Sequence, residues 1–115
     1  MVTRWTETRT RPVCALARIH ELAAKQAVHY GSSRVQKHAE NLGYSFEAVC
    51  RCLAQLAPET FHRAERYSAT GPWLDVYLLS YRGPTNQVDP LYVKLKLDRD
   101  CLCIILCSFH LEGAL

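Results

Sequence analysis

Three polar side chains alternate with apolar residues near the end of the chain, and they could act on a phosphate group. Tyr92, Lys94 and Lys96 are separated by Val93 and Leu95, so a strand would place all three on one face. Lysine binds phosphate as a point charge, and tyrosine can stack on a base or transfer a proton. The same pattern is typical of a solvated sheet face, which the spacing by itself favours.

Two arginines and a histidine could complete such a site. Arg63 and Arg66 precede Tyr67, and a guanidinium offers a planar fork that matches phosphate oxygens. His110 lies near the end of the chain, and an imidazole titrates near neutral pH, which suits general acid or base catalysis. Taken alone, each of these residues is more often an ordinary surface side chain.

The residue pattern predicts neither a metal centre nor a bound cofactor. The sequence contains no glycine-rich phosphate loop, His-Glu-x-x-His or Gly-x-Ser-x-Gly motif. Its six cysteines include no Cys-x-x-Cys pair, and we expect reduced thiols that act as small buried hydrophobic residues. Cys101, Cys103 and Cys107 share parity and are expected to point to one face of a strand.

Charge and hydropathy indicate a cytoplasmic protein that tolerates a polyanionic partner. The chain has 14 basic and 11 acidic residues and a net charge of +3, without a run of five basic residues. The first residues lack the apolar segment of a signal peptide, and the apolar run 101–109 is too short to span a bilayer. We therefore expect no association with a membrane.

The first half of the chain is predicted to be helical. A first helix is expected to begin at Thr10 and to fade near Gly31. A second opens at a capping box on Ser33 and ends at Gly43. Ser45 begins a third helix, whose apolar stripe runs at helical spacing through Phe46, Val49, Cys50 and Leu53.

The second half is predicted to form strands, beginning after the Gly71-Pro72 pair. Residues 73–81 and 91–97 have strand composition, and a last strand, apolar on both faces, follows a turn at 98–100 and runs to about Phe109. Helices followed by an antiparallel meander predict a single α+β domain spanning 1–115. The N-terminal helices would cover one face of the sheet and leave Tyr92, Lys94 and Lys96 accessible on the other.

Several segments between Ser33 and His110 resemble the MqsR family of bacterial type II toxins. Residues 43–50 are similar to the start of that family's long helix, and Trp73-Leu74-Asp75-Val76-Tyr77 is similar to its Trp-x-Asp-Val-Tyr motif. Residues 91–95 resemble its Val-Tyr-Leu-Lys-Ile strand, and Ser108-Phe109 matches its closing strand.

This resemblance implies a fold akin to the RelE ribonuclease toxins, and cleavage of free single-stranded mRNA without the ribosome and without metal. The family's active site is described as a lysine, a glutamine, a tyrosine and a second lysine, which fall here on Arg63, Leu74, Tyr92 and His110. We therefore expect the catalytic residues to be Arg63, Tyr92 and His110, and the substrate-binding residues to be Lys94, Lys96 and Arg66.

Metal-independent cleavage of RNA uses the RNA's own 2′-hydroxyl, which attacks the adjacent phosphate. The reaction needs a base, an acid and cations for the developing charge. We expect Arg63 to clamp the phosphate, Lys94 to help hold its charge, Tyr92 to orient or deprotonate the 2′-hydroxyl, and His110 to act as the acid. The roles of Tyr92 and His110 could be reversed.

The resemblance also implies a cognate antitoxin with a zinc-binding part and a DNA-binding part, so zinc is expected in the partner and not in this chain. Two features depart from the family pattern: Leu74 cannot form a hydrogen bond, and the loop 82–90 and the turn before the last strand are longer. A non-catalytic RNA-binding module of the same fold is therefore one alternative. A protein-interaction domain that uses a sheet edge or a helical groove is a second.

Overall fold

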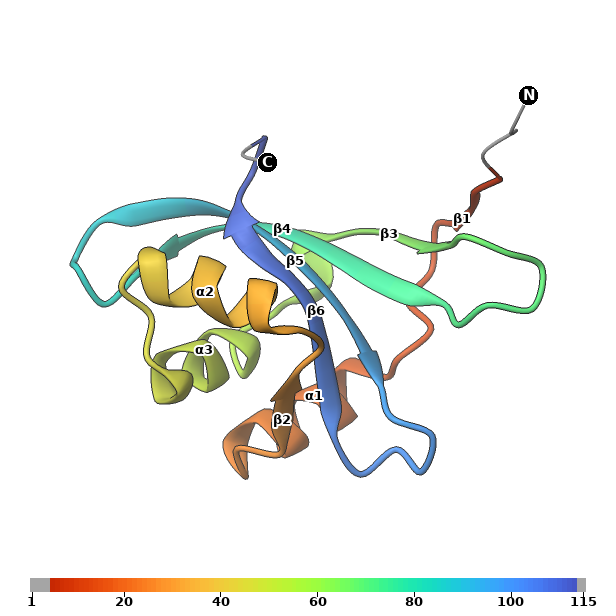
Figure 1. The fold of residues 1–115 in the computed structure, drawn as a ribbon, viewed down its shortest axis with the longest axis horizontal. Helices are drawn as coiled ribbons and strands as arrows, with labels where there is room; N and C mark the ends of the chain where they lie inside the picture. The colour runs from red at the N-terminus through yellow and green to blue at the C-terminus, as the bar shows by residue number, and fades with distance from the viewer. Residues whose placement is uncertain (1–4, 114–115) are drawn as a thin grey trace.

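The computed structural model describes residues 5–113 and consists of three α-helices against a six-stranded, mostly antiparallel sheet (Figure 1). This confirms the predicted α+β class. The strand order in the sheet is β1-β3-β4-β5-β6-β2. Along the chain the elements are β1 (Glu7–Arg9), α1 (Leu16–Ala24), β2 (Val28–Tyr30), α2 (Ser33–Asn41), α3 (Phe46–Leu53), the 3₁₀ turn η1 (Pro58–Thr60), β3 (Phe61–Arg66), β4 (Leu74–Arg82), β5 (Val88–Leu97) and β6 (Ile104–Leu111).

The sheet is larger than the predicted three-stranded meander, because three short or polar strands join it. β1 pairs antiparallel with β3, and β3 pairs antiparallel with β4. β2 pairs in parallel with β6, so β6 lies inside the sheet between β5 and β2, a position that suits a strand with two apolar faces. Strand β3 also begins earlier in the chain than the predicted strand region, which starts after Gly71-Pro72.

The first helix begins later than predicted. α1 starts at Leu16, with Ala15 as its N-cap, and Thr10 lies outside it. The reason is tertiary: the backbone N–H groups of Val13 and Cys14 donate to the two carboxylate oxygens of Asp75, at 2.9 and 2.8 Å. Asp75, the acidic residue of the Trp-x-Asp-Val-Tyr segment, therefore anchors the N-terminal segment to β4.

The other two helices end and begin where local chemistry predicts, with one shift. Ser45 caps α3 by accepting from the N–H of Ala48, and Gly43 ends α2 with a positive φ of 87°. The N-cap of α2 is Ser32 rather than Ser33, and its hydroxyl accepts from the N–H of Val35.

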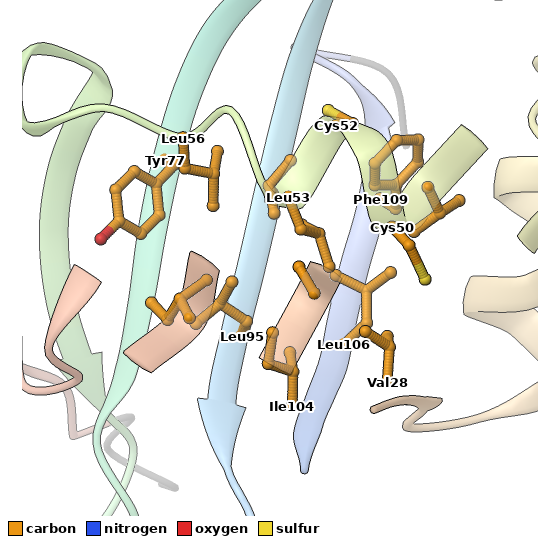
Figure 2. Close-up of a cluster of buried hydrophobic side chains, with 14 of the residues drawn as sticks. Val28, Cys50, Cys52, Leu53, Leu56, Tyr77, Leu95, Ile104, Leu106 and Phe109 are labelled. Atoms are coloured by element: carbon orange, nitrogen blue, oxygen red, sulfur yellow. The ribbon is translucent and has the colours of Figure 1, made fainter. Parts of the chain in front are cut away.

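The hydrophobic core lies between the sheet and the helices α1 and α3. In Figure 2 the side chains of Cys50 and Leu53 on α3 meet those of Leu95, Leu106 and Phe109 on the sheet, and all five are buried. The predicted apolar stripe of α3 is thus the face that covers the sheet. Within residues 5–113, no helix combines the length and the apolar character that crossing a bilayer requires.

The six cysteines are free thiols, and Cys14, Cys50, Cys52 and Cys103 are buried as predicted. Cys101 is exposed and Cys107 is only half-buried, so the prediction of burial is wrong for Cys101. The expectation that Cys101, Cys103 and Cys107 share one face of a strand is wrong. Cys101 and Cys103 precede β6, and Cys107 lies at an irregularity in its register, so the alternation of faces does not extend across the three.

Candidate active site

An irregularity in β3 directs two charged side chains away from the core. Phe61 pairs with Tyr77 of β4, but Arg63 pairs with the next residue, Val76, so His62 is an extra residue in the strand. Phe61 therefore packs edge-on against Tyr77 on the helix side, with ring centroids 5.5 Å apart. Arg63 and Glu65 point to the opposite side of the sheet, which we call the open face.

A second irregularity does the same in β6. Leu95 of β5 pairs with Leu106, whereas Lys94 pairs with Ser108, so Cys107 is the extra residue. Leu106 and Phe109 are both buried in the core. Because faces alternate on either side of this bulge, Ser108 and His110 emerge on the open face.

Strand register brings the predicted residues together across β3, β4, β5 and β6. Arg63 lies opposite Val76, which lies opposite Lys94. Tyr92, one step along the same face of β5, lies directly opposite His110. The regular alternation predicted for residues 91–97 is confirmed, with Leu91, Val93 and Leu95 buried beneath the open face.

A buried carboxylate joins the cations of this face into what we call the cation cluster: Arg63, Glu65, Tyr67 and Lys94. Glu65, with only 5% of its side chain exposed, accepts from Arg63 Nε at 2.8 Å and from Lys94 Nζ at 2.9 Å. Lys94 Nζ also lies 2.6 Å from Tyr67 Oη, which donates to Glu65. Two cations and one anion leave a single net positive charge, which matches one phosphodiester.

These contacts stabilise the ionised forms of Glu65, Lys94 and Arg63. Burial would raise the pKa of Glu65, but the hydrogen bonds from Tyr67, Arg63 and Lys94 lower it to about 2. Burial would lower the pKa of Lys94, yet the hydrogen bonds with Tyr67 and Glu65 raise it above its ordinary value. The hydrogen bond to Glu65 likewise raises the pKa of Arg63. All three groups are therefore ionised near neutral pH.

Tyr92 and His110, the aromatic pair, adjoin the cation cluster. Their rings are stacked, with centroids 5.0 Å apart and an interplanar angle of 9°, and Lys94 Nζ lies 5.7 Å from the centroid of Tyr92. Nδ1 of His110 lies 2.8 Å from the carbonyl oxygen of Leu111. Because a carbonyl only accepts, Nδ1 carries the proton and Nε2 is the nitrogen that can exchange one.

Two predicted substrate-binding residues lie outside the cluster. The Arg66 guanidinium pairs with Glu7 of β1 and lies 4.7 Å from the ring of Trp73. Lys96 shares the open face with Lys94 but lies farther along β5, where it lines a pocket together with Trp73 and Asp98. The structure thus gathers Arg63, Lys94, Tyr92 and His110, and it leaves Arg66 and Lys96 at the periphery.

Glu65 and His38, two neighbours of the site, were not assigned from the sequence. Glu65 was missed because a charged residue in a polar hexapeptide gives no sign of burial, although its two-residue spacing from Arg63 and Tyr67 suits one strand face. His38 of α2 reaches the site only through the tertiary fold, and its ring meets that of His110 edge-on at 5.9 Å.

The model of one known protein family matches most of the chain. The family model described as "Motility quorum-sensing regulator, toxin of MqsA" matches residues 11–111. The chain belongs to the MqsR toxin family. Family membership makes it a toxin of a toxin–antitoxin system and implies an antitoxin partner. No curated protein matches the chain.

At Leu74 this MqsR-family chain loses a polar side chain that the resemblance places in the site. Leu74, where the resemblance places a glutamine, is 9% exposed and lies directly opposite Glu65. The hydrogen-bonding group beside this position is therefore the carboxylate of the neighbouring strand.

Proposed function

We propose that this toxin is a metal-independent endoribonuclease that cleaves single-stranded mRNA in the cytoplasm. The observation that carries the proposal is the convergence of two cations and two proton-exchanging side chains on one face. These four side chains, Arg63, Lys94, Tyr92 and His110, come from three strands. Arg63 and Lys94 both donate hydrogen bonds to Glu65. Lys94 also lies near the ring of Tyr92, which stacks on His110.

The chemistry follows from these groups. The 2′-oxygen of the RNA attacks the adjacent phosphorus, and the bond to the 5′-oxygen breaks, which gives a 2′,3′-cyclic phosphate and a free 5′-hydroxyl. Arg63 and Lys94 hold the scissile phosphate and stabilise its developing charge. One member of the aromatic pair takes the proton of the 2′-hydroxyl, and the other gives a proton to the leaving oxygen.

We assign the acid role to His110 and the base or orienting role to Tyr92, with the reverse assignment open to test. The exchangeable Nε2 of His110 suits either direction of transfer. Arg63 contacts Glu65 through Nε and His62 through Nη1. The remaining N–H groups of its guanidinium can still donate to a phosphate oxygen.

A second candidate is an RNA-binding module that lacks catalysis, and Leu74 favours it, because it supplies no hydrogen bond where the resemblance places a glutamine. The two functions are separated by incubating the purified chain with a 5′-labelled single-stranded RNA in EDTA. We expect cleavage to products that end in a cyclic phosphate, and no cleavage of the matching DNA, which lacks the 2′-hydroxyl. Intact RNA that stays bound would support the binding module instead.

The antitoxin completes the proposal. We propose that it carries a zinc-binding part and a DNA-binding part, and that zinc belongs to the partner. Stoichiometric zinc in the purified toxin, measured by atomic emission, would contradict this assignment.

A further inference from the structure

A pocket next to the aromatic pair is not used by the proposed cleavage chemistry. It has a volume of about 290 Å³ and opens between α2 and β6; we call it the side pocket. It is lined by Ser32, Arg34, Val35, His38, Cys107, Ser108 and His110. His110 therefore belongs both to the aromatic pair and to the wall of this pocket.

The pocket exists because β2 stops pairing half-way along β6. The ladder joins Val28–Tyr30 to Ile104–Leu106, and the N–H of Gly31 closes it by donating to Leu106 at 2.7 Å. The backbones approach so closely here that a Cβ on Gly31 would lie 3.0 Å from the Leu106 oxygen. The chain then turns into α2, which packs beside the rest of β6 (Figure 1). The side pocket is the space left between α2 and β6 where β6 bulges at Cys107.

The lining offers rings and hydrogen-bond donors. The ring of His38 meets that of His110 edge-on, at an interplanar angle of 88°. The ring of His110 is in turn stacked on that of Tyr92. Within residues 5–113, the Arg34 guanidinium, the His38 ring and the Ser108 hydroxyl have no hydrogen-bond partner on another side chain or the backbone. Unpaired RNA bases are recognised by such groups, through stacking on aromatic rings or guanidinium planes and through hydrogen bonds to the base edge.

We propose that the side pocket binds one nucleobase of the RNA, beside the phosphate held by the cation cluster, and sets the base preference of cleavage. This inference rests on the proposed function. The volume lies just below the roughly 300–1,000 Å³ typical of small-ligand sites, which suits a single base. Because Arg34 only donates, the pocket favours a base edge rich in acceptors, such as O6 and N7 of guanine or the carbonyls of uracil, over an edge with an exocyclic amine.

The test is a cleavage assay on RNA with randomised sequence, in which the ends of the products give the base frequencies around the cut. Arg34→Ala and His38→Ala are compared with wild type and with Lys37→Ala, an exposed cation of the same helix that does not line the pocket. We expect the preference at one position beside the cut to fall roughly tenfold in the two pocket variants, since a good side-chain–base pair discriminates by about that factor. Lys37→Ala should keep the wild-type profile.

Two outcomes overturn the inference, and they differ from failure of the proposed function. Identical base profiles for wild type and both pocket variants would remove the pocket from recognition while leaving the nuclease intact. If wild type cuts no RNA, the nuclease proposal fails, and the pocket is judged by NMR titration with GMP, UMP, AMP and CMP. Shifts at the amides of Cys107 and Ser108 that are lost in Arg34→Ala would support base binding, and unshifted amides would reject it.

Discussion

At the scale of single residues, the proposed chemistry depends on the stacked rings of Tyr92 and His110. Tyr92→Phe removes only the hydroxyl, and His110→Ala removes the ring with the exchangeable Nε2. We predict that each lowers the rate of RNA cleavage by about 10²–10⁴-fold, as expected for loss of a general acid or base.

His29→Ala is the matched control for His110→Ala, because His29 is an exposed histidine on the neighbouring strand β2. Rates should be measured on a labelled RNA under single-turnover conditions, with circular dichroism to verify folding. If both site variants cleave within a few-fold of wild type while folded, the assignment of acid and base is wrong.

A second prediction for a single residue concerns the buried carboxylate of Glu65. Its pKa is about 2 in the fold against an ordinary value of 4.5, so its ionised form stabilises the folded chain above pH 4.5. This contribution is lost as the pH falls from 4.5 toward 2. Glu65→Gln, which cannot ionise, should be less stable than wild type at neutral pH, and the difference should shrink across that window.

Urea unfolding at a series of pH values measures this difference. The exposed Glu40→Gln serves as the control and should follow wild type throughout. A stability deficit of Glu65→Gln that stays constant from pH 6 to pH 2 would show that the charge of Glu65 plays no part.

At the scale of elements, Asp75 decides how the N-terminal segment joins the sheet. Its carboxylate accepts from the N–H groups of Val13 and Cys14, and it is fully buried. Asp75→Ala leaves both donors without this acceptor, and we predict a loss of about 2–6 kcal/mol in the free energy of unfolding, since each unsatisfied buried group costs roughly 1–3 kcal/mol.

Asp75→Asn keeps one acceptor oxygen and should lose less than Asp75→Ala. Asp100→Ala, in the exposed turn before β6, should stay close to wild type in the same denaturation experiment. Equal stability of Asp75→Ala and Asp100→Ala would mean that the contact does not anchor the segment.

At the scale of the whole molecule, a net charge of only +3 means that RNA binding depends on where the cations lie. Lys96 lies on the open face beyond the cation cluster, where it can contact a phosphate next to the scissile one. We predict that Lys96→Ala weakens RNA binding. The slope of log K against log[salt] should become less steep by about 0.7, the value for one phosphate contact on a single strand.

The control is Lys25→Ala, since Lys25 is the C-cap of α1, which covers the other face, and pairs with Glu21 of that helix. Fluorescence anisotropy at several salt concentrations gives both slopes. A Lys96→Ala slope equal to that of wild type would place the RNA elsewhere on the surface.

The sequence by itself determined the elements whose pattern is local. The alternation of residues 91–97 predicted which side chains of β5 face outward, and the stripe of α3, its Ser45 cap and the Gly43 stop predicted the helix that covers the core. These features follow from side-chain periodicity and from backbone groups that find partners a few residues away. The family resemblance added Arg63 and His110, which no spacing rule would have joined to Tyr92.

Only the tertiary structure decided which strands neighbour one another and where their registers slip. The strands β1 and β2 are three residues each, too short to show a period, and β3 is polar, so their pairing partners define them. The extra residues His62 and Cys107 turn Arg63, Ser108 and His110 to the open face, and no local pattern encodes a bulge that depends on the partner strand. The burial of Glu65 and the approach of His38 to His110 arise in the same way, because contacts between distant segments form only when the sheet and α2 assemble.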